Sequence, residues 1–431
     1  MISNWLAAAL ARRNIHYGWV MVGVTFLAAL ISAGTVGAPG VFIVPLQREF
    51  GWTTAEISSA LSIRFMLFGL MAPFAAALMN RYGLRNVTLA AQLVVVSGLV
   101  GSLFMTKVWQ LVLLWGVVIG IGTGMTALVL GATIATRWFV ARRGLVVGIM
   151  TASVATGQLV FLPALAAITE RVGWRVALAL VCAMLGVAAF AVLMVMRDRP
   201  SDVGQRPFGD QGTEPLPAPP PNNTPIMAVA LGTLRDSSKS AVFWILFATF
   251  FVCGASTNGL VQVHLIPMCL DFGIPQVQAA SLLAAMGIFD FFGTIISGWL
   301  SDRYDNRWLL FWYYGLRGLS LLFLPYSDFT FYGLSLFAVF YGLDWIATVP
   351  PTVRLTAQRF GAERANLVFG WIFAGHQLGA GVAAFGAGLS RTVYLTYLPA
   401  FFVAGALCIV AALIVLAIAR PVKVAAATAP A

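Results

Sequence analysis

The sequence predicts an all-α membrane protein whose twelve transmembrane helices form two six-helix halves. Hydrophobic residues make up 60% of the 431 residues, charged residues only 10%, and the mean hydropathy is +0.90. A soluble domain has about 45–50% apolar and about 25% charged residues, whereas a helix that crosses a bilayer needs roughly 20 apolar residues. Apolar runs of that length recur along the chain, and the second set repeats motifs of the first. Together these observations indicate a doubled helical bundle in a membrane.

Twelve apolar runs are long enough to span a bilayer. In chain order they cover residues 17–45, 53–78, 86–106, 109–135, 144–168, 174–196, 241–270, 276–300, 307–326, 329–356, 364–389 and 393–419. We expect residues 1–200 to form the first half, 201–240 a cytoplasmic linker, and 241–431 the second half. The linker contains a proline-rich stretch at 215–221, and we expect it to be flexible apart from a short helix at 227–234.

The distribution of basic residues predicts the orientation. If both termini are cytoplasmic, most of the 26 Lys and Arg residues fall on the cytoplasmic side, as the positive-inside rule requires. The net charge of +11 therefore reports topology and predicts no nucleic-acid partner. Residues 1–13 form a short amphipathic lead without a cleavable signal, so we expect a multi-pass protein of the plasma or bacterial inner membrane.

Within the first half, Thr53 or Thr54 is an expected N-cap ahead of Glu56, and Arg64 follows deep inside the second apolar run. The turn at 76–85 is repeated at 298–307, where the Leu, Arg-Tyr and final Arg positions match at one fixed offset. At nearly the same offset, the sequence of residues 136–143 resembles that of 357–364, and Gln158 corresponds to Gln377. Repetition in the same orientation predicts two parallel halves related by an axis along the membrane normal.

The sequence contains no enzyme motif. There is no G-x-S-x-G, no phosphate-binding loop and no metal-spaced His/Glu cluster, and the four cysteines lie in apolar runs without C-x-x-C spacing. We therefore expect no cofactor, no resident metal and no enzymatic activity. A nucleotide-binding motif is also missing, so we expect no activity driven by ATP hydrolysis.

Ionisable side chains inside apolar runs are the first candidates for function, because a charge at the bilayer centre costs about 2.5–3.5 kcal/mol on insertion scales. Six such residues occur: Arg64, His264, Asp290, Arg317, Asp344 and His376. A carboxylate or imidazole in such a site can exchange protons near neutral pH. The alternatives are a helix-joining ion pair for Asp290, a carbonyl-bonded neutral imidazole for His376, and a gate or a pair with an acid of the second half for Arg64.

Several motifs resemble the major facilitator superfamily. The turn Gly298–Arg307 matches the superfamily's loop signature, and the 76–85 copy departs from it at Ala76 and Asn80. The segments 16–19, 40–52 and 137–145 resemble the monocarboxylate porter branch, which includes the oxalate/formate antiporter. The resemblance implies a small-molecule transporter that works as a monomer by alternating access. Two family cations are missing: Thr294 stands where the branch has an arginine on span 8, and His376 stands where the antiporter has a lysine on span 11.

The resulting hypothesis is a proton-coupled symporter for a small organic anion, a mono- or dicarboxylate. The expected substrate contacts are Arg64, Gln158, Asn258, Gln262, Asp290, His376 and Gln377. Asp290 and His376 would carry or tune the proton. Arg81, Asp302 and Arg303 would belong to the gating turns, and Arg317 with Asp344 would form a structural ion pair. The alternatives are a drug or metabolite effluxer and a copper importer that uses His264 and Met268.

Overall fold

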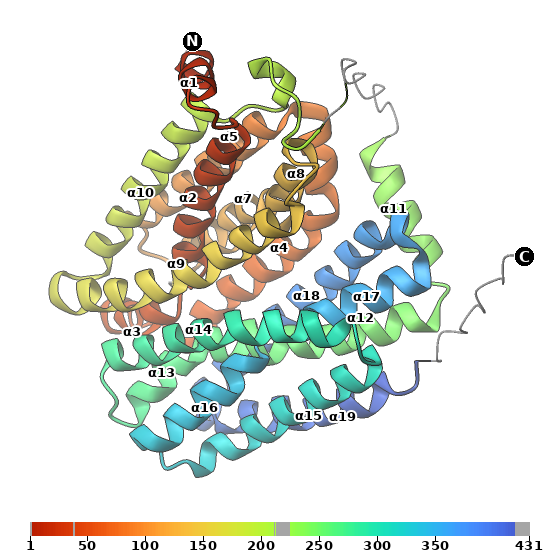
Figure 1. Cartoon of the computed structure of the whole chain (residues 1–431). Coiled ribbons are helices and arrows are strands. Elements are labelled where there is room, and N and C mark those ends of the chain that lie inside the picture. Colours follow the sequence, from red (N-terminus) through yellow and green to blue (C-terminus); the bar gives the residue numbers. More distant parts are fainter. Residues whose placement is uncertain (1, 38, 211, 213–224, 419–431) are drawn as a thin grey trace, which may run out of the picture.

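The computed structural model of the chain describes residues 2–37, 39–210, 212 and 225–418. Helices dominate these residues, whose one bridge between extended segments joins Phe139 and Phe208. Figure 1 shows the helices of residues 1–200, red to yellow-green, on one side of the molecule and those of residues 241–418, green to blue, on the other. The fold is therefore an all-helical bundle of two halves.

The first half contains a short lead helix followed by long helices that run back and forth. Its elements are α1 (Ile2–Ala11), α2 (Gly18–Gly37), α3 (Pro39–Phe50), α4 (Thr54–Tyr82), α5 (Leu84–Ser102), α6 (Val108–Leu111), the π-helical η1 (Val112–Val118), α7 (Ile119–Gly124), α8 (Ala127–Trp138), α9 (Arg143–Val172) and α10 (Trp174–Val195). Thr53 caps α4 by accepting from the backbone N–H of Glu56, as predicted.

The second half follows the linker elements, the 3₁₀ turn η2 (Pro200–Val203) and α11 (Ile226–Ser237). Its elements are α12 (Ala241–Gly254), the π-helical η3 (Ala255–Val261), α13 (Gln262–Asp271), α14 (Gln276–Ser301), α15 (Asn306–Phe323), the 3₁₀ turn η4 (Leu324–Tyr326), α16 (Phe331–Asp344), α17 (Val349–Phe360), α18 (Ala362–Tyr394) and α19 (Leu398–Val415).

Each of the twelve predicted apolar runs coincides with one helix or with consecutive helices. Within the described residues, eight helices are long and apolar enough to cross a membrane, and two shorter apolar helices cover Gly18–Ser32 and Val108–Gly124. The count of twelve spans therefore stays a prediction. One predicted span in each half is broken into two helices. In the first half α7 ends at Gly124 before α8, and in the second half α16 ends at Asp344 before α17. Broken helices at corresponding positions are the usual surroundings of a transporter's binding site.

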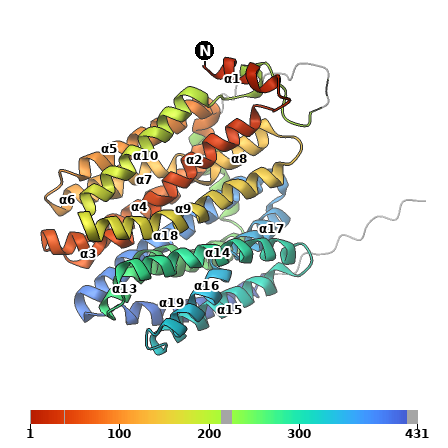
Figure 2. The same cartoon turned by 60° about the vertical axis from the view of Figure 1, so that its left-hand side comes forward.

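Among the described residues, the main contacts between the two halves are those of α4 with α18, α9 with α14, and α3 with α13. Figure 2 shows α9 of the first half lying along α14 of the second. Glycines allow the close approach of α4 and α18, since a Cβ at Gly69 would lie 2.5 Å from Cβ of Gln377 and one at Gly388 would lie 2.4 Å from Oγ of Ser58. Small residues at such contacts are typical of helix packing in membranes.

Hydrogen bonds between the two halves close one end of this seam. We call the end that holds η2 and α11 the linker end, and the opposite end, where α4 begins, the far end. At the far end Gln276 Nε2 donates to Val41 O at 2.7 Å, and the backbone N–H of Ala55 donates to Thr392 Oγ1 at 3.1 Å. Both hydrogen bonds join one half to the other. They would have to break before the far end of the seam opens.

Glu49 ties helices of the first half together at the far end. Its carboxylate accepts from Trp174 Nε1 at 2.6 Å and forms an ion pair with Arg175. Partial burial opposes ionisation, but these two partners outweigh it and lower the pKa of the Glu49 carboxyl. The motif Glu49–Trp52 therefore has a packing role at this end.

The linker differs from the expected flexible segment in its first part, while the helix expected at 227–234 lies within α11 (Ile226–Ser237). Its first part is bound to the linker end of the first half: His16 Nε2 lies 2.7 Å from Arg206 O, and Phe208 makes aromatic contacts with Trp19 and Phe139. Its last part forms α11, which packs on both α4 and α18, and Trp371 Nε1 donates to Ala230 O at 2.9 Å. The aromatic contacts and this buried hydrogen bond explain the order of these two parts. The proline-rich residues 215–221 lie outside the described residues.

Candidate functional site

Arg64 lies on α4 with a side chain that is only 4% exposed. Its position is fixed by a glycine stripe on the neighbouring helix: Cβ atoms at Gly116, Gly120 and Gly124 would each lie within about 3 Å of α4. A Cβ at Gly120 would meet the Cα of Arg64 itself at 3.1 Å. This four-residue glycine spacing is visible in the sequence and is a known signal of close helix packing in membranes, but our sequence analysis did not use it.

The guanidinium of Arg64 has no hydrogen-bond acceptor and no carboxylate partner among the described residues. The other two buried arginines differ: Arg307 pairs with Asp305 at 2.6 Å, and Arg317 pairs with Asp344 at 2.7 Å. A buried charge without a partner is strongly unfavourable in a low-dielectric environment. Arg64 therefore lacks a counter-charge among the described residues.

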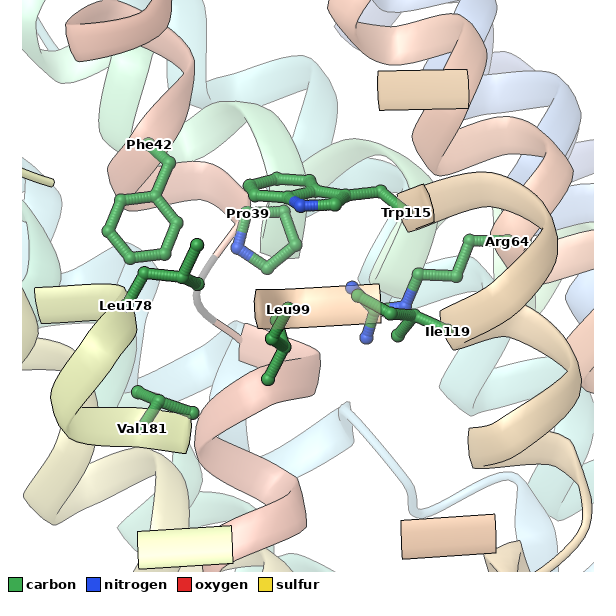
Figure 3. A pocket seen from close by; sticks show the side chains of 8 residues that line it. All are labelled: Pro39, Phe42, Arg64, Leu99, Trp115, Ile119, Leu178 and Val181. Atoms are coloured by element: carbon green, nitrogen blue, oxygen red, sulfur yellow. The ribbon is translucent and has the colours of Figure 1, made fainter. Parts of the chain in front are cut away.

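A small cavity of about 10 Å³ adjoins Arg64. Figure 3 shows the side chains around it: Pro39, Phe42, Leu99, Trp115, Ile119, Leu178 and Val181. That space is about one water molecule in size, so no organic anion fits beside Arg64 in this conformation. All these residues belong to the first half. Among the described residues no acid of the second half pairs with Arg64, so that alternative has no support in this conformation.

Asp290 lies on α14 and is 7% exposed. Its Oδ1 accepts from the backbone N–H of Ile346 at 2.8 Å and from Thr294 Oγ1 at 3.1 Å. Ile346 stands in the break between α16 and α17, and Gly293 permits the approach, since a Cβ there would lie 1.8 Å from Leu343 O. Asp290 thus caps a broken helix with the help of Thr294, the residue that replaces the family's arginine. Both of its described partners are uncharged donors, so the alternative of a helix-joining ion pair has no support here.

Arg317 and Asp344 form a buried ion pair between α15 and the end of α16. Arg317 also donates to the backbone carbonyls of Asp344 and Trp345 and to Cys253 Sγ, the last at 2.9 Å. The guanidinium of Arg317 therefore binds backbone carbonyls at the same helix break where Asp290 accepts from a backbone N–H. Sequence reasoning missed Cys253 and Ile346 because a thiol and a backbone amide give no sequence signal for such a contact.

Asn258 lies in the π-helical η3, and Gln262 is the first residue of α13. Gln262 is 3% exposed, and its Nε2 has no acceptor among the described residues. Its backbone carbonyl approaches Gly40, where a Cβ would lie 3.1 Å away. Asn258 is half-buried. Gln262 therefore offers an unused donor close to the seam with α3.

His376 and Gln377 lie on α18 and are both buried. The imidazole of His376 lies between Phe250 and Phe373, with ring centroids 4.9 and 5.7 Å away, and its Nδ1 has no partner among the described residues. No contact among the described residues therefore supports the alternative of a carbonyl-bonded imidazole. Gln377 meets Gly69 of α4, and its Oε1 also lacks a donor among the residues described. Gln158 lies on α9, and its side chain is outside the described part of the structure.

The residues of the gating turns lie at the linker end of the bundle. Asp302 forms an ion pair with Arg354 of α17, while Arg303 lies 4.2 Å from the ring centroid of Trp299. Arg81 is exposed beside Tyr82. The signature turn thus links α14 to α17 within the second half.

His264 and Met268 lie on α13 and are fully buried. His264 Nε2 lies 2.9 Å from the carbonyl of Ala384, and its ring packs on Tyr397. Among the described residues, no three His, Cys, Asp or Glu side chains gather in a way that would hold a metal ion. Nε2 of His264 is engaged with the backbone of α18, while its Nδ1 has no partner among the described residues.

Comparison with known proteins identifies relatives along nearly the whole chain. The family model described as Major Facilitator Superfamily matches residues 25–384 and again 265–431. Human monocarboxylate transporter 7 is 27% identical over 375 residues, which cover 76% of this chain and 71% of that protein. Monocarboxylate transporter 12-B of Danio rerio is 25% identical, with 94% and 87% covered. YcxA of Bacillus subtilis, an uncharacterised transporter of the same type, is 23% identical, with 88% and 89% covered. These relatives are transporters and not enzymes, and they confirm the resemblance to the monocarboxylate branch.

Solved structures of transporters share the fold. A D-xylose-proton symporter superposes with a TM-score of 0.72 at 14% identity, covering 94% of this chain and 99% of that one. The nucleoside transporter NupG gives a TM-score of 0.73 at 12% identity, with 93% and 100% covered. At these identities the similarity shows the fold and does not identify the substrate.

Proposed function

The chain belongs to the major facilitator superfamily, and on that basis we propose that it is a secondary transporter of a small organic anion, a mono- or dicarboxylate. The relatives named monocarboxylate transporters support this substrate class. Transport would proceed by alternating access, with the two halves rocking about the seam of α4 and α18. The positive-inside pattern supports cytoplasmic termini and a place in the plasma or bacterial inner membrane.

The observation that carries the proposal is the unpaired guanidinium of Arg64. A carboxylate would supply its missing charge and both acceptors of a bidentate contact. The adjoining cavity of about 10 Å³ is too small for such a ligand, so the anion would bind in another conformation. Separation of the two halves at the far end, which requires the hydrogen bonds of Gln276 to Val41 and of Ala55 to Thr392 to break, would give the anion room.

Proton coupling is the second part of the proposal. Asp290 accepts from Ile346 with the same oxygen that Thr294 contacts. When that carboxylate takes up a proton it becomes a weaker acceptor, so protonation would loosen the break between α16 and α17. His376, which is buried close to α12, would tune this step. Gln158, Asn258, Gln262 and Gln377 would provide polar contacts to the substrate.

We expect Asp290→Asn to abolish proton-driven uptake and to retain substrate exchange. The amide oxygen still accepts from Ile346, so the break keeps its cap, but the group no longer carries a proton. The measurement is uptake of labelled formate, lactate, pyruvate and benzoate into proteoliposomes with and without an inward proton gradient, beside counterflow exchange. A matched control is Asp236→Asn, since that carboxylate is exposed on α11.

The same assay separates the alternative functions. Uptake that follows the proton gradient equally in both variants would refute the role of Asp290. An effluxer of cationic compounds would not need Arg64, and a copper importer would fail after changes to His264 and Met268 but not after Asp290→Asn. A chain that moves none of the carboxylates would contradict the proposed substrate class.

A further inference from the structure

A groove of about 450 Å³ lies between α15 and α16 in the second half. Its walls come from residues 313–323 of α15 and 336–344 of α16, and they are apolar apart from Tyr313, Ser320 and Asp344. The groove shares no lining residue with the cavity beside Arg64, which belongs to the first half. It is therefore a second and separate space in the molecule.

The groove opens on the side of the bundle that faces lipid. Leu316, Leu319 and Phe340 line it and are 52%, 57% and 63% exposed. Such large apolar surfaces on membrane-spanning helices are covered by the hydrocarbon of the bilayer. At 1.5 Å per residue, the lining stretch of α15 is about 15 Å long, which is half the thickness of a hydrocarbon core of about 30 Å. The groove thus has the length of one leaflet and ends deep in the membrane.

Asp344 forms the polar end of the groove. The residue is 7% exposed, and its Oδ2 accepts from Arg317 Nε at 2.7 Å. Its Oδ1 is buried and has no donor among the described residues. A buried acceptor without a partner is costly, and the cost is larger in a membrane because no bulk water reaches it.

The charge balance at Asp344 defines the donor that fits. Arg317 already neutralises the carboxylate, so a second cation would bring an uncompensated positive charge into an apolar space. A neutral hydroxyl supplies one donor and no charge. The rest of the groove requires an apolar body.

We propose that the groove between α15 and α16 binds a lipophilic alcohol or phenol, whose apolar body lies against Leu316, Leu319 and Phe340 and whose hydroxyl donates to Asp344 Oδ1. The ligand enters from the bilayer and not from the aqueous path of the substrate. The inference does not depend on the proposed function, because the ligand contacts neither Arg64 nor Asp290.

The test compares 4-octylphenol with octylbenzene, which has the same apolar body and lacks the hydroxyl. Binding to the purified full-length protein in one detergent is measured as the concentration dependence of thermal stabilisation. One net hydrogen bond corresponds to about three- to ten-fold in affinity, so octylphenol should bind tighter by that factor. Equal binding of the two probes would overturn the role of Asp344.

Two matched tryptophan variants locate the ligand. Leu319→Trp fills the groove and should abolish binding of both probes. Leu413→Trp on α19 changes a residue of similar exposure, 60%, outside the groove and should leave binding unchanged. Leu316→Trp, one turn away in the groove, repeats the test if Leu319→Trp does not fold. Retained octylphenol binding in a folded groove variant would place the ligand elsewhere and overturn the proposal.

Discussion

Replacement of Arg64 by Gln is expected to abolish carboxylate transport and to leave the protein folded, with equal or higher thermal stability. The guanidinium is buried and has no acceptor among the described residues, so its removal relieves the penalty of an uncompensated charge. Loss of one partner of a buried, hydrogen-bonded charge pair costs about 2–5 kcal/mol, or roughly 30-fold or more in affinity. A structural arginine would show the opposite sign, because its loss lowers stability.

The measurement combines uptake into proteoliposomes with unfolding of the purified protein. Arg64→Lys keeps the charge but loses the planar, bidentate geometry, so we expect an intermediate rate. Arg48→Gln is the matched control, since Arg48 is exposed near the end of α3. Transport that survives Arg64→Gln at the natural rate would show that the substrate's charge is bound elsewhere.

Replacement of Arg317 by Leu is expected to cause the largest loss of stability in the chain. The change leaves Asp344 buried without its partner, and breaking a buried ion pair costs about 3–5 kcal/mol. It also removes the donor for the carbonyls of Asp344 and Trp345 at the break between α16 and α17. We expect low yield and an early unfolding transition.

The double variant Arg317→Leu/Asp344→Leu distinguishes charge imbalance from lost packing. If the unpaired carboxylate is the main cause, removal of both charges should restore much of the stability, as it does for other buried ion pairs. Chemical unfolding of the single and double variants in the same detergent measures this. A double variant as unstable as Arg317→Leu would instead make the bonds to the backbone carbonyls the main contribution.

The sequence predicts the fold well because the physical signals for it are strong. Long apolar runs have few alternatives to membrane helices, and the repeated turns at 76–85 and 298–307 predict the division into halves. The expected deep positions of Arg64, Asp290 and His376 correspond to buried side chains.

The direction in which those side chains point is not readable from the sequence. The sequence predicts Arg64 as a substrate contact but not that its side chain enters the first half, where the glycine stripe 116–124 brings α7 against α4. Asp290 accepts from the backbone N–H of Ile346. This contact depends on where the helix breaks and not on the side chain of Ile346. Likewise, Phe208 orders part of a linker whose composition suggests flexibility.

The central claim is that an organic carboxylate supplies the missing counter-charge of Arg64. Its most direct test is the thermal stabilisation of the purified protein by formate, lactate, pyruvate and benzoate, each compared with its amide. The account predicts that at least one carboxylate stabilises the natural chain more than its amide does, and that this difference disappears in Arg64→Gln. A carboxylate that stabilises Arg64→Gln as strongly as the natural chain would contradict the account.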